Sequence, residues 1–91
     1  MLIKPNRTIV RGRVRTIQPE PGGIGARVEI EVLANESPSP EEDFLRPEPG
    51  SLFCAFLADP ELLRVDAEVR VGASLVAGPG GGRAVIESVA S

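Results

Sequence analysis

The stretch that decides the fold is "IVRGRVRTI", Ile9 to Ile17, near the start of a chain of 91 residues. Its apolar and charged positions alternate with a period of two, which is typical of a half-buried β-strand. A glycine inside a strand often marks a bulge or a barrel corner, so Gly12 predicts a strongly bent strand. The alternation divides the strand into an inner face, Thr8, Val10, Gly12, Val14 and Thr16, and an outer face, Ile9, Arg11, Arg13, Arg15 and Ile17.

Four further segments have strand character: "ARVEIEVL" (26–33), "SLFCAFLA" (51–58), "AEVRVGASLVA" (67–77) and "RAVIESVA" (83–90). The continuous apolar run of 51–58 is typical of a strand covered on both faces. We therefore expect Cys54, which lies in this run, to be an inert core residue. Gly72 predicts a second bent strand. Asp59, as N-cap, and Pro60, at the first helical position, predict a short helical turn between the third and fourth strands.

Five short, bent strands predict an all-β protein: a five-stranded antiparallel barrel forming one domain over residues 1–91. Residues 35–50 contain four prolines and five acids against one arginine. This composition predicts a long, acidic, partly mobile loop, with Phe44 and Leu45 holding its middle to the barrel. The glycine-rich segment 78–82 predicts a hairpin connection to the last strand.

Residue types that are missing from the sequence exclude several kinds of chemistry. Without histidine there is no imidazole base, and a single cysteine allows neither an intrachain disulfide nor a cysteine-cluster metal site. We expect no enzyme activity, no cofactor and no metal. An unpaired cysteine fits a reducing compartment. No apolar run has the length of a signal peptide or a membrane span, so the sequence predicts a cytoplasmic protein without a membrane partner.

The chain resembles the OB-fold superfamily, the oligonucleotide/oligosaccharide-binding barrels. The resemblance rests on the strand bent at Gly12, on the alternating strand 26–33, on "ADPELLRVDAEVRV" (58–71) and on "GGRAVIESV" (81–89). It covers nearly the whole chain and implies a barrel that binds ligand across its second and third strands. Many such proteins have a glycine before the fourth strand, where this chain has Asp66.

The distribution of charge suggests a nucleic-acid ligand. The net charge is −3, yet residues 1–19 hold five bases and no acid. A basic stripe beside an aromatic platform is what single-stranded nucleic acid requires. Phe53 would stack a base if it faces outward and would belong to the core if it faces inward. The candidate nucleic-acid-binding residues are Lys4, Arg7, Arg11, Arg13, Arg15, Phe53 and Arg83.

Three other interpretations stay open. Arg13 and Arg15 could form cross-strand ion pairs with Glu29 and Glu31, which would make the stripe a structural feature. The apolar third strand and the acidic Pro-rich loop could instead form a surface for a protein partner or for self-association. A third class, an oxyanion or small-molecule carrier, would build its site between copies of the chain.

Overall fold

The computed structural model, which describes residues 5–78 and 81–90, places "IVRGRVRTI" in a long bent strand, β1 (Thr8–Pro19). β1 pairs along its length with β2 (Ala26–Asn35), and the register shifts between Arg11 and Gly12. A Cβ atom on Gly12 would collide with the carbonyl oxygen of Glu31 and with the side chain of Ile30. The bend at Gly12 therefore brings the two strands closer together than any other residue would allow.

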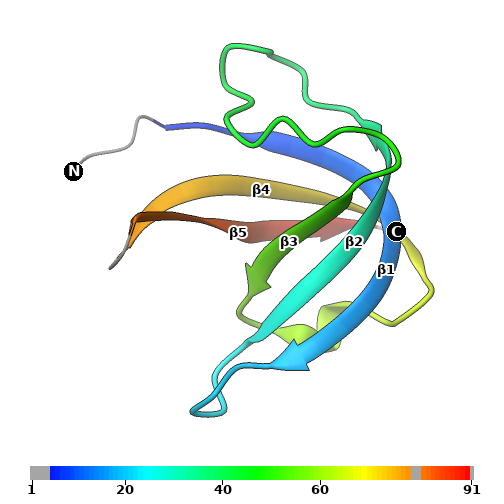
Figure 1. Cartoon of the computed structure of the whole chain (residues 1–91), viewed down its shortest axis with the longest axis vertical. Coiled ribbons are helices and arrows are strands. Elements are labelled where there is room, and N and C mark those ends of the chain that lie inside the picture. The colour runs from blue at the N-terminus through cyan, green and yellow to red at the C-terminus, as the bar shows by residue number, and fades with distance from the viewer. Residues whose placement is uncertain (1–4, 79–80, 91) are drawn as a thin grey trace.

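The remaining elements close the barrel. They are β3 (Leu52–Leu57), the 3-10 segment η1 (Pro60–Leu62), β4 (Glu68–Gly78) and β5 (Gly81–Ala90). The strand order around the closed barrel is β1-β2-β3-β5-β4, with β4 pairing back to β1. Figure 1 shows β1 and β2 curving around one side of the barrel, while β4 and β5 cross behind β3. No helix in the described part of the chain is long or apolar enough to cross a membrane.

The prediction of a purely antiparallel barrel is wrong at one seam. β3 and β5 run parallel, and a single residue pair, Phe56 with Val85, joins them over the described residues. β5 must pair with β4 as a hairpin, from Gly78 opposite Gly81 onward, and this fixes its direction. β3 pairs antiparallel with β2 on its other edge, so its contact with β5 can only be parallel.

The inner face of β1 follows the predicted alternation only as far as Val14. Val14 pairs with Ile30 and Thr16 with Glu29, so Arg15 is an extra residue in a bulge. The bulge reverses the phase of the strand. Ile17, predicted to face outward, consequently packs against the core, and Thr16 is only partly buried. Apart from Thr8, the largest fully buried side chains are apolar: Val10, Val14, Val28, Ile30, Val32 and Val71.

The acidic loop between β2 and β3 is held to the barrel by a buried carboxylate. Asp43 is 5% exposed and accepts hydrogen bonds from Thr8 Oγ1 (2.7 Å), Asn35 Nδ2 (2.7 Å) and the Arg46 backbone N–H (2.9 Å). Leu45 packs against the core as predicted. The prediction for Phe44 is wrong, because its side chain is 38% exposed.

The link between β3 and β4 begins as the sequence predicts. Asp59 caps η1 by accepting from the Glu61 N–H, and Pro60 takes the first helical position. Before β4, Asp66 has a φ of 71°, a left-handed conformation that favours glycine. The chain thus needs the backbone of a glycine where it carries an aspartate.

Candidate functional site

The arginines of β1 are engaged with partners on the barrel itself. Arg15 Nη2 forms an ion pair with Glu31 Oε1 at 2.8 Å, as the cross-strand interpretation anticipated. Arg13 lies opposite Glu31 in the register, yet its Nη1 donates to the carbonyl oxygen of Asp66 at 2.8 Å. Glu29, the other expected partner, accepts a hydrogen bond from Thr16 Oγ1 instead.

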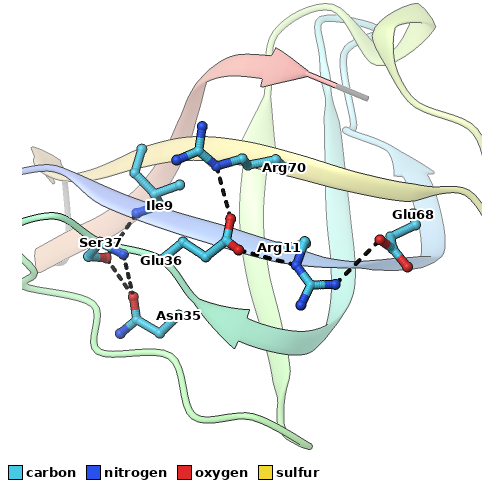
Figure 2. A network of polar contacts seen from close by, with 7 residues as sticks. All are labelled: Ile9, Arg11, Asn35, Glu36, Ser37, Glu68 and Arg70. Carbon is cyan, nitrogen blue, oxygen red and sulfur yellow. Dashed lines mark hydrogen bonds and ion pairs between the residues drawn. The ribbon is translucent and has the colours of Figure 1, made fainter.

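Arg11 belongs to a small charged network that joins β1, β4 and the start of the acidic loop. Figure 2 shows Glu36 between two arginines, accepting from Arg11 Nε at 3.2 Å and from Arg70 Nε at 3.0 Å. Arg11 Nη1 reaches Glu68 at 3.4 Å. The Glu36 N–H donates to the carbonyl oxygen of Ile9, so the backbone holds this carboxylate in place. Arg11 is thereby neutralised by two carboxylates.

The orientation of β3 decides between the two alternatives for Phe53 and corrects two predictions. Phe53 points inward and is 7% exposed, so it belongs to the core and cannot stack a base. Cys54 is exposed and is not a core residue. β3 is not covered on both faces either, because Leu52 is 59% exposed. Pairing with β2 turns Phe53, Ala55 and Leu57 into the barrel, and this phase leaves Leu52, Cys54 and Phe56 outside.

Two adjoining hollows lie along this outer face, and both are lined by Cys54 and Ala84. The first, about 420 Å³, lies between the start of β3 and the end of the acidic loop and includes Arg46 and Leu52. The second, about 320 Å³, lies at the end of β3 and includes Arg27 and Phe56. They follow the seam where β3 and β5 share one residue pair. Together we call them the β3 groove, lined by Glu20, Arg27, Leu45, Arg46, Pro47, Glu48, Ser51, Leu52, Phe53, Cys54, Ala55, Phe56, Arg83 and Ala84.

An aromatic ring and a guanidinium meet in the second hollow. The Cζ atom of Arg83 lies 4.4 Å from the centroid of the Phe56 ring, within the range of a cation–π contact. Among the described residues, neither Arg83 nor Arg27 nor Arg46 makes a salt bridge. The β3 groove therefore carries three arginines that form no salt bridge with a carboxylate in the described part of the chain.

The predicted nucleic-acid-binding residues do not form one surface. In the strand order, β2 separates β1 from β3 and β4 separates β1 from β5. Arg11, Arg13 and Arg15 consequently lie on a different side of the barrel from Arg83. Arg7 is exposed and borders a third hollow, of about 250 Å³, which is also lined by Gly72 and Glu87. Lys4 lies outside the described residues.

Sequence reasoning missed three residues of the β3 groove: Phe56, Arg27 and Arg46. Phe56 and Phe53 lie in the same apolar run, and nothing within it distinguishes an inward from an outward phenylalanine. The neighbouring strand held the available signal: Arg27 alternates with Val28 and must face outward, and the register sets Phe56 opposite Arg27. The position of Arg46 depends on the path of the acidic loop, which has no periodic pattern.

No group of three or more Cys, Asp or Glu side chains among the described residues could hold a metal ion. Burial would raise the pKa of Asp43, but hydrogen bonds from Asn35, Thr8 and Arg46 outweigh it and hold the pKa below its ordinary value. That carboxylate is occupied by structural partners.

In comparisons with known proteins, no family model, no curated protein and no solved structure matches this chain.

Proposed function

We propose that this chain is a non-enzymatic binding module of the OB class, and that it binds single-stranded nucleic acid in the β3 groove. A five-stranded barrel with a helical turn between the third and fourth strands is the architecture that the sequence resemblance implies. Barrels of that class bind oligonucleotides across their second and third strands. The β3 groove lies on that side of this barrel.

The observation that carries the proposal is the position of the arginines that make no salt bridge with a described residue: Arg27 and Arg83 line the same hollow as Phe56, and Arg46 lines the adjoining one. Arg11 and Arg15 are paired with carboxylates, whereas Arg27, Arg46 and Arg83 line the groove without a salt bridge to any described residue. Two acids, Glu20 and Glu48, line the groove as well, so its positive excess is small. This balance favours a ligand with few phosphates, bound weakly.

The chemistry of the groove suggests how a strand would be held. The three arginines would contact phosphates, and one base would stack near Phe56 together with the Arg83 guanidinium. With three phosphate contacts on a single strand, the logarithm of the binding constant should fall with the logarithm of salt with a slope of about −2. A stacked base adds about 1–3 kcal/mol.

The test is a fluorescence-anisotropy titration of a labelled oligothymidylate at low salt. Phe56→Ala should weaken binding about fivefold or more, since it removes a stacking platform worth about 1–3 kcal/mol. Arg83→Ala should weaken binding and flatten the salt slope by about 0.7. Two matched controls are Arg15→Ala, on β1, and Arg64→Ala, in the link between η1 and β4. Each removes the same charge from a residue that does not line the groove, so affinity should change little.

Two results would overturn the proposal. One is the absence of oligonucleotide binding at low salt by a folded protein. The other is an equal loss of affinity in Arg83→Ala and Arg64→Ala, which would show a general charge effect without a site.

A second candidate function is a protein-interaction module that uses the first hollow. The observation that favours it is the exposed Leu52, which borders this hollow together with Leu45 and Pro47. These three apolar residues would suit an apolar side chain of a partner. If Leu52→Asp abolishes self-association seen by light scattering in the wild type, while oligonucleotides fail to bind, this second function replaces the first.

A further inference from the structure

We infer that the hollow over Gly72, on the outer face of β4 and β5, is a binding site for a single oxyanion of the phosphate class. The site is separate from the β3 groove, and the inference does not depend on the proposed function. We call it the Gly72 hollow. Its polar residues are Arg7, before β1, Arg70, on β4, and Ser88, on β5.

The Gly72 hollow exists because the chain has no side chain at its floor. β4 and β5 shift register between Gly72 and Ala73, and a Cβ on Gly72 would collide with Ser88 Oγ. The hollow measures about 80 Å³. That exceeds the roughly 10–15 Å³ that one water requires and gives room for a small tetrahedral ion. It is far smaller than either hollow of the β3 groove.

Two arginine residues, Arg7 and Arg70, line this small space. Arg70 uses its Nε to reach Glu36, and no hydrogen bond or ion pair to a described residue uses its two terminal nitrogens. Figure 2 shows those nitrogens directed away from Glu36. Arg7 makes no salt bridge among the described residues. Guanidinium forks match the geometry of phosphate oxygens, and the hydroxyl of Ser88 can add a third donor.

An adjoining hollow limits what the anion can be attached to. This adjoining hollow measures about 250 Å³ and shares Arg7, Gly72 and Ser88 with the Gly72 hollow. It is also lined by Glu87. A second negative charge placed there would be repelled by that carboxylate. The site therefore suits one phosphate that is either free or esterified to an uncharged group.

Glu36 acts as an internal competitor for the same cation. Its carboxylate takes the Nε of Arg70 and lowers the positive potential that an incoming anion would meet. Removing the charge of Glu36 without changing its shape should tighten anion binding. If Arg70 binds the anion, this change should raise the affinity for phosphate. If Arg70 only pairs with Glu36 to stabilise the fold, the affinity should not change.

The experiment is an NMR titration of the ¹⁵N-labelled protein with inorganic phosphate, at constant ionic strength maintained with chloride. We expect saturable shifts of the Gly72 and Ser88 amide signals. Arg70→Ala and Arg7→Ala should each weaken binding by about tenfold. Glu36→Gln should tighten it severalfold, whereas Glu41→Gln, an equal charge change at an exposed residue of the same loop, should not.

A parallel titration with glycerol 1-phosphate distinguishes the two sources of the anion. Tighter binding of the ester would assign the site to phosphomonoesters, and tighter binding of inorganic phosphate would assign it to the free ion. Shifts that fail to saturate, or that survive in both arginine variants, would overturn the inference. Equal effects of Glu36→Gln and Glu41→Gln would overturn it too, and this comparison does not rely on a variant that loses binding by misfolding.

Discussion

Replacing Asp43 with alanine should destabilise the protein more than any other single change of an acidic residue in the loop. The substitution removes three hydrogen bonds, two of them at 2.7 Å, from a side chain that is 5% exposed. It also leaves the hydroxyl of Thr8, which is fully buried, without its acceptor. A hydrogen bond to a charged group contributes about 1.5–3 kcal/mol, and an orphaned buried hydroxyl costs about 1–3 kcal/mol. Asn35 and Arg46 are exposed, so water can replace Asp43 as the acceptor for the Asn35 side chain and for the Arg46 backbone N–H. We therefore expect a total loss of about 3 kcal/mol.

The assay is urea denaturation of Asp43→Ala beside Glu41→Ala, which removes an exposed acid two residues away. In a thermal unfolding experiment, the same loss of about 3 kcal/mol should lower the Tm of a domain of this size by about 12–24 °C. Adding Thr8→Val to Asp43→Ala should recover about 1 kcal/mol, because the orphaned hydroxyl disappears. If Asp43→Ala and Glu41→Ala unfold within about 0.5 kcal/mol of each other, the hydrogen bonds of Asp43 do not hold the loop.

The same carboxylate gives the protein an acid-dependent stability. Its pKa in the folded state lies below the ordinary 3.8, so the unfolded chain takes up this proton first as the pH falls. The contribution of Asp43 to the free energy of unfolding is complete above about pH 5 and is lost as the pH falls through the lowered pKa. In Asp43→Ala this component of the acid dependence should be missing. A wild type and a variant that lose stability in parallel below pH 4 would contradict the assignment.

Three further predictions follow from the backbone and the surface charges. Gly12→Ala should cost about 3 kcal/mol in urea denaturation, whereas Gly22→Ala, which has open space but a φ of 98°, should cost about 1 kcal/mol. Asp66→Gly should be more stable than Asp66→Ala by about 1 kcal/mol in the same assay, because φ is 71° there. Arg15→Ala should cost at most about 1 kcal/mol, and less at high salt, because its pair with Glu31 is exposed to solvent.

Much of the fold could be predicted from local patterns. The alternation in 26–33 and 67–77 gave two strands, and Gly12 and Gly72 both lie at register shifts. The capping of η1 by Asp59 was predicted residue by residue. These features depend on period, on turn chemistry and on backbone freedom, all of which are local properties of the sequence.

The errors within the strands share one physical origin, because each depends on pairing between distant segments. The bulge at Arg15 is set by the register with β2, and it alone moves Ile17 into the core. The phase of β3 is set by β2 as well, because both faces of "SLFCAFLA" are apolar. The parallel seam between β3 and β5 follows from closure of the barrel. An extra residue in a bulge reverses the alternation of a strand, and a strand that is apolar on both faces has no alternation. In both cases periodicity cannot predict which side chains face the core.

The position of the candidate site depends on the acids as much as on the arginines. The sequence predicts a binding surface on β1, where the cations are densest. In the fold, however, carboxylates from neighbouring segments reach β1: Glu31 from β2, Glu68 from β4 and Glu36 from the loop. Glu36 follows β2 directly, and the pairing of its backbone with Ile9 brings its carboxylate between Arg11 and Arg70. Arg11 and Arg15 of this stripe are paired with carboxylates, whereas the arginines that line the β3 groove make no salt bridge with a described residue. Arg27, Arg46 and Arg83 are far apart in the sequence, and only barrel closure brings them to one groove.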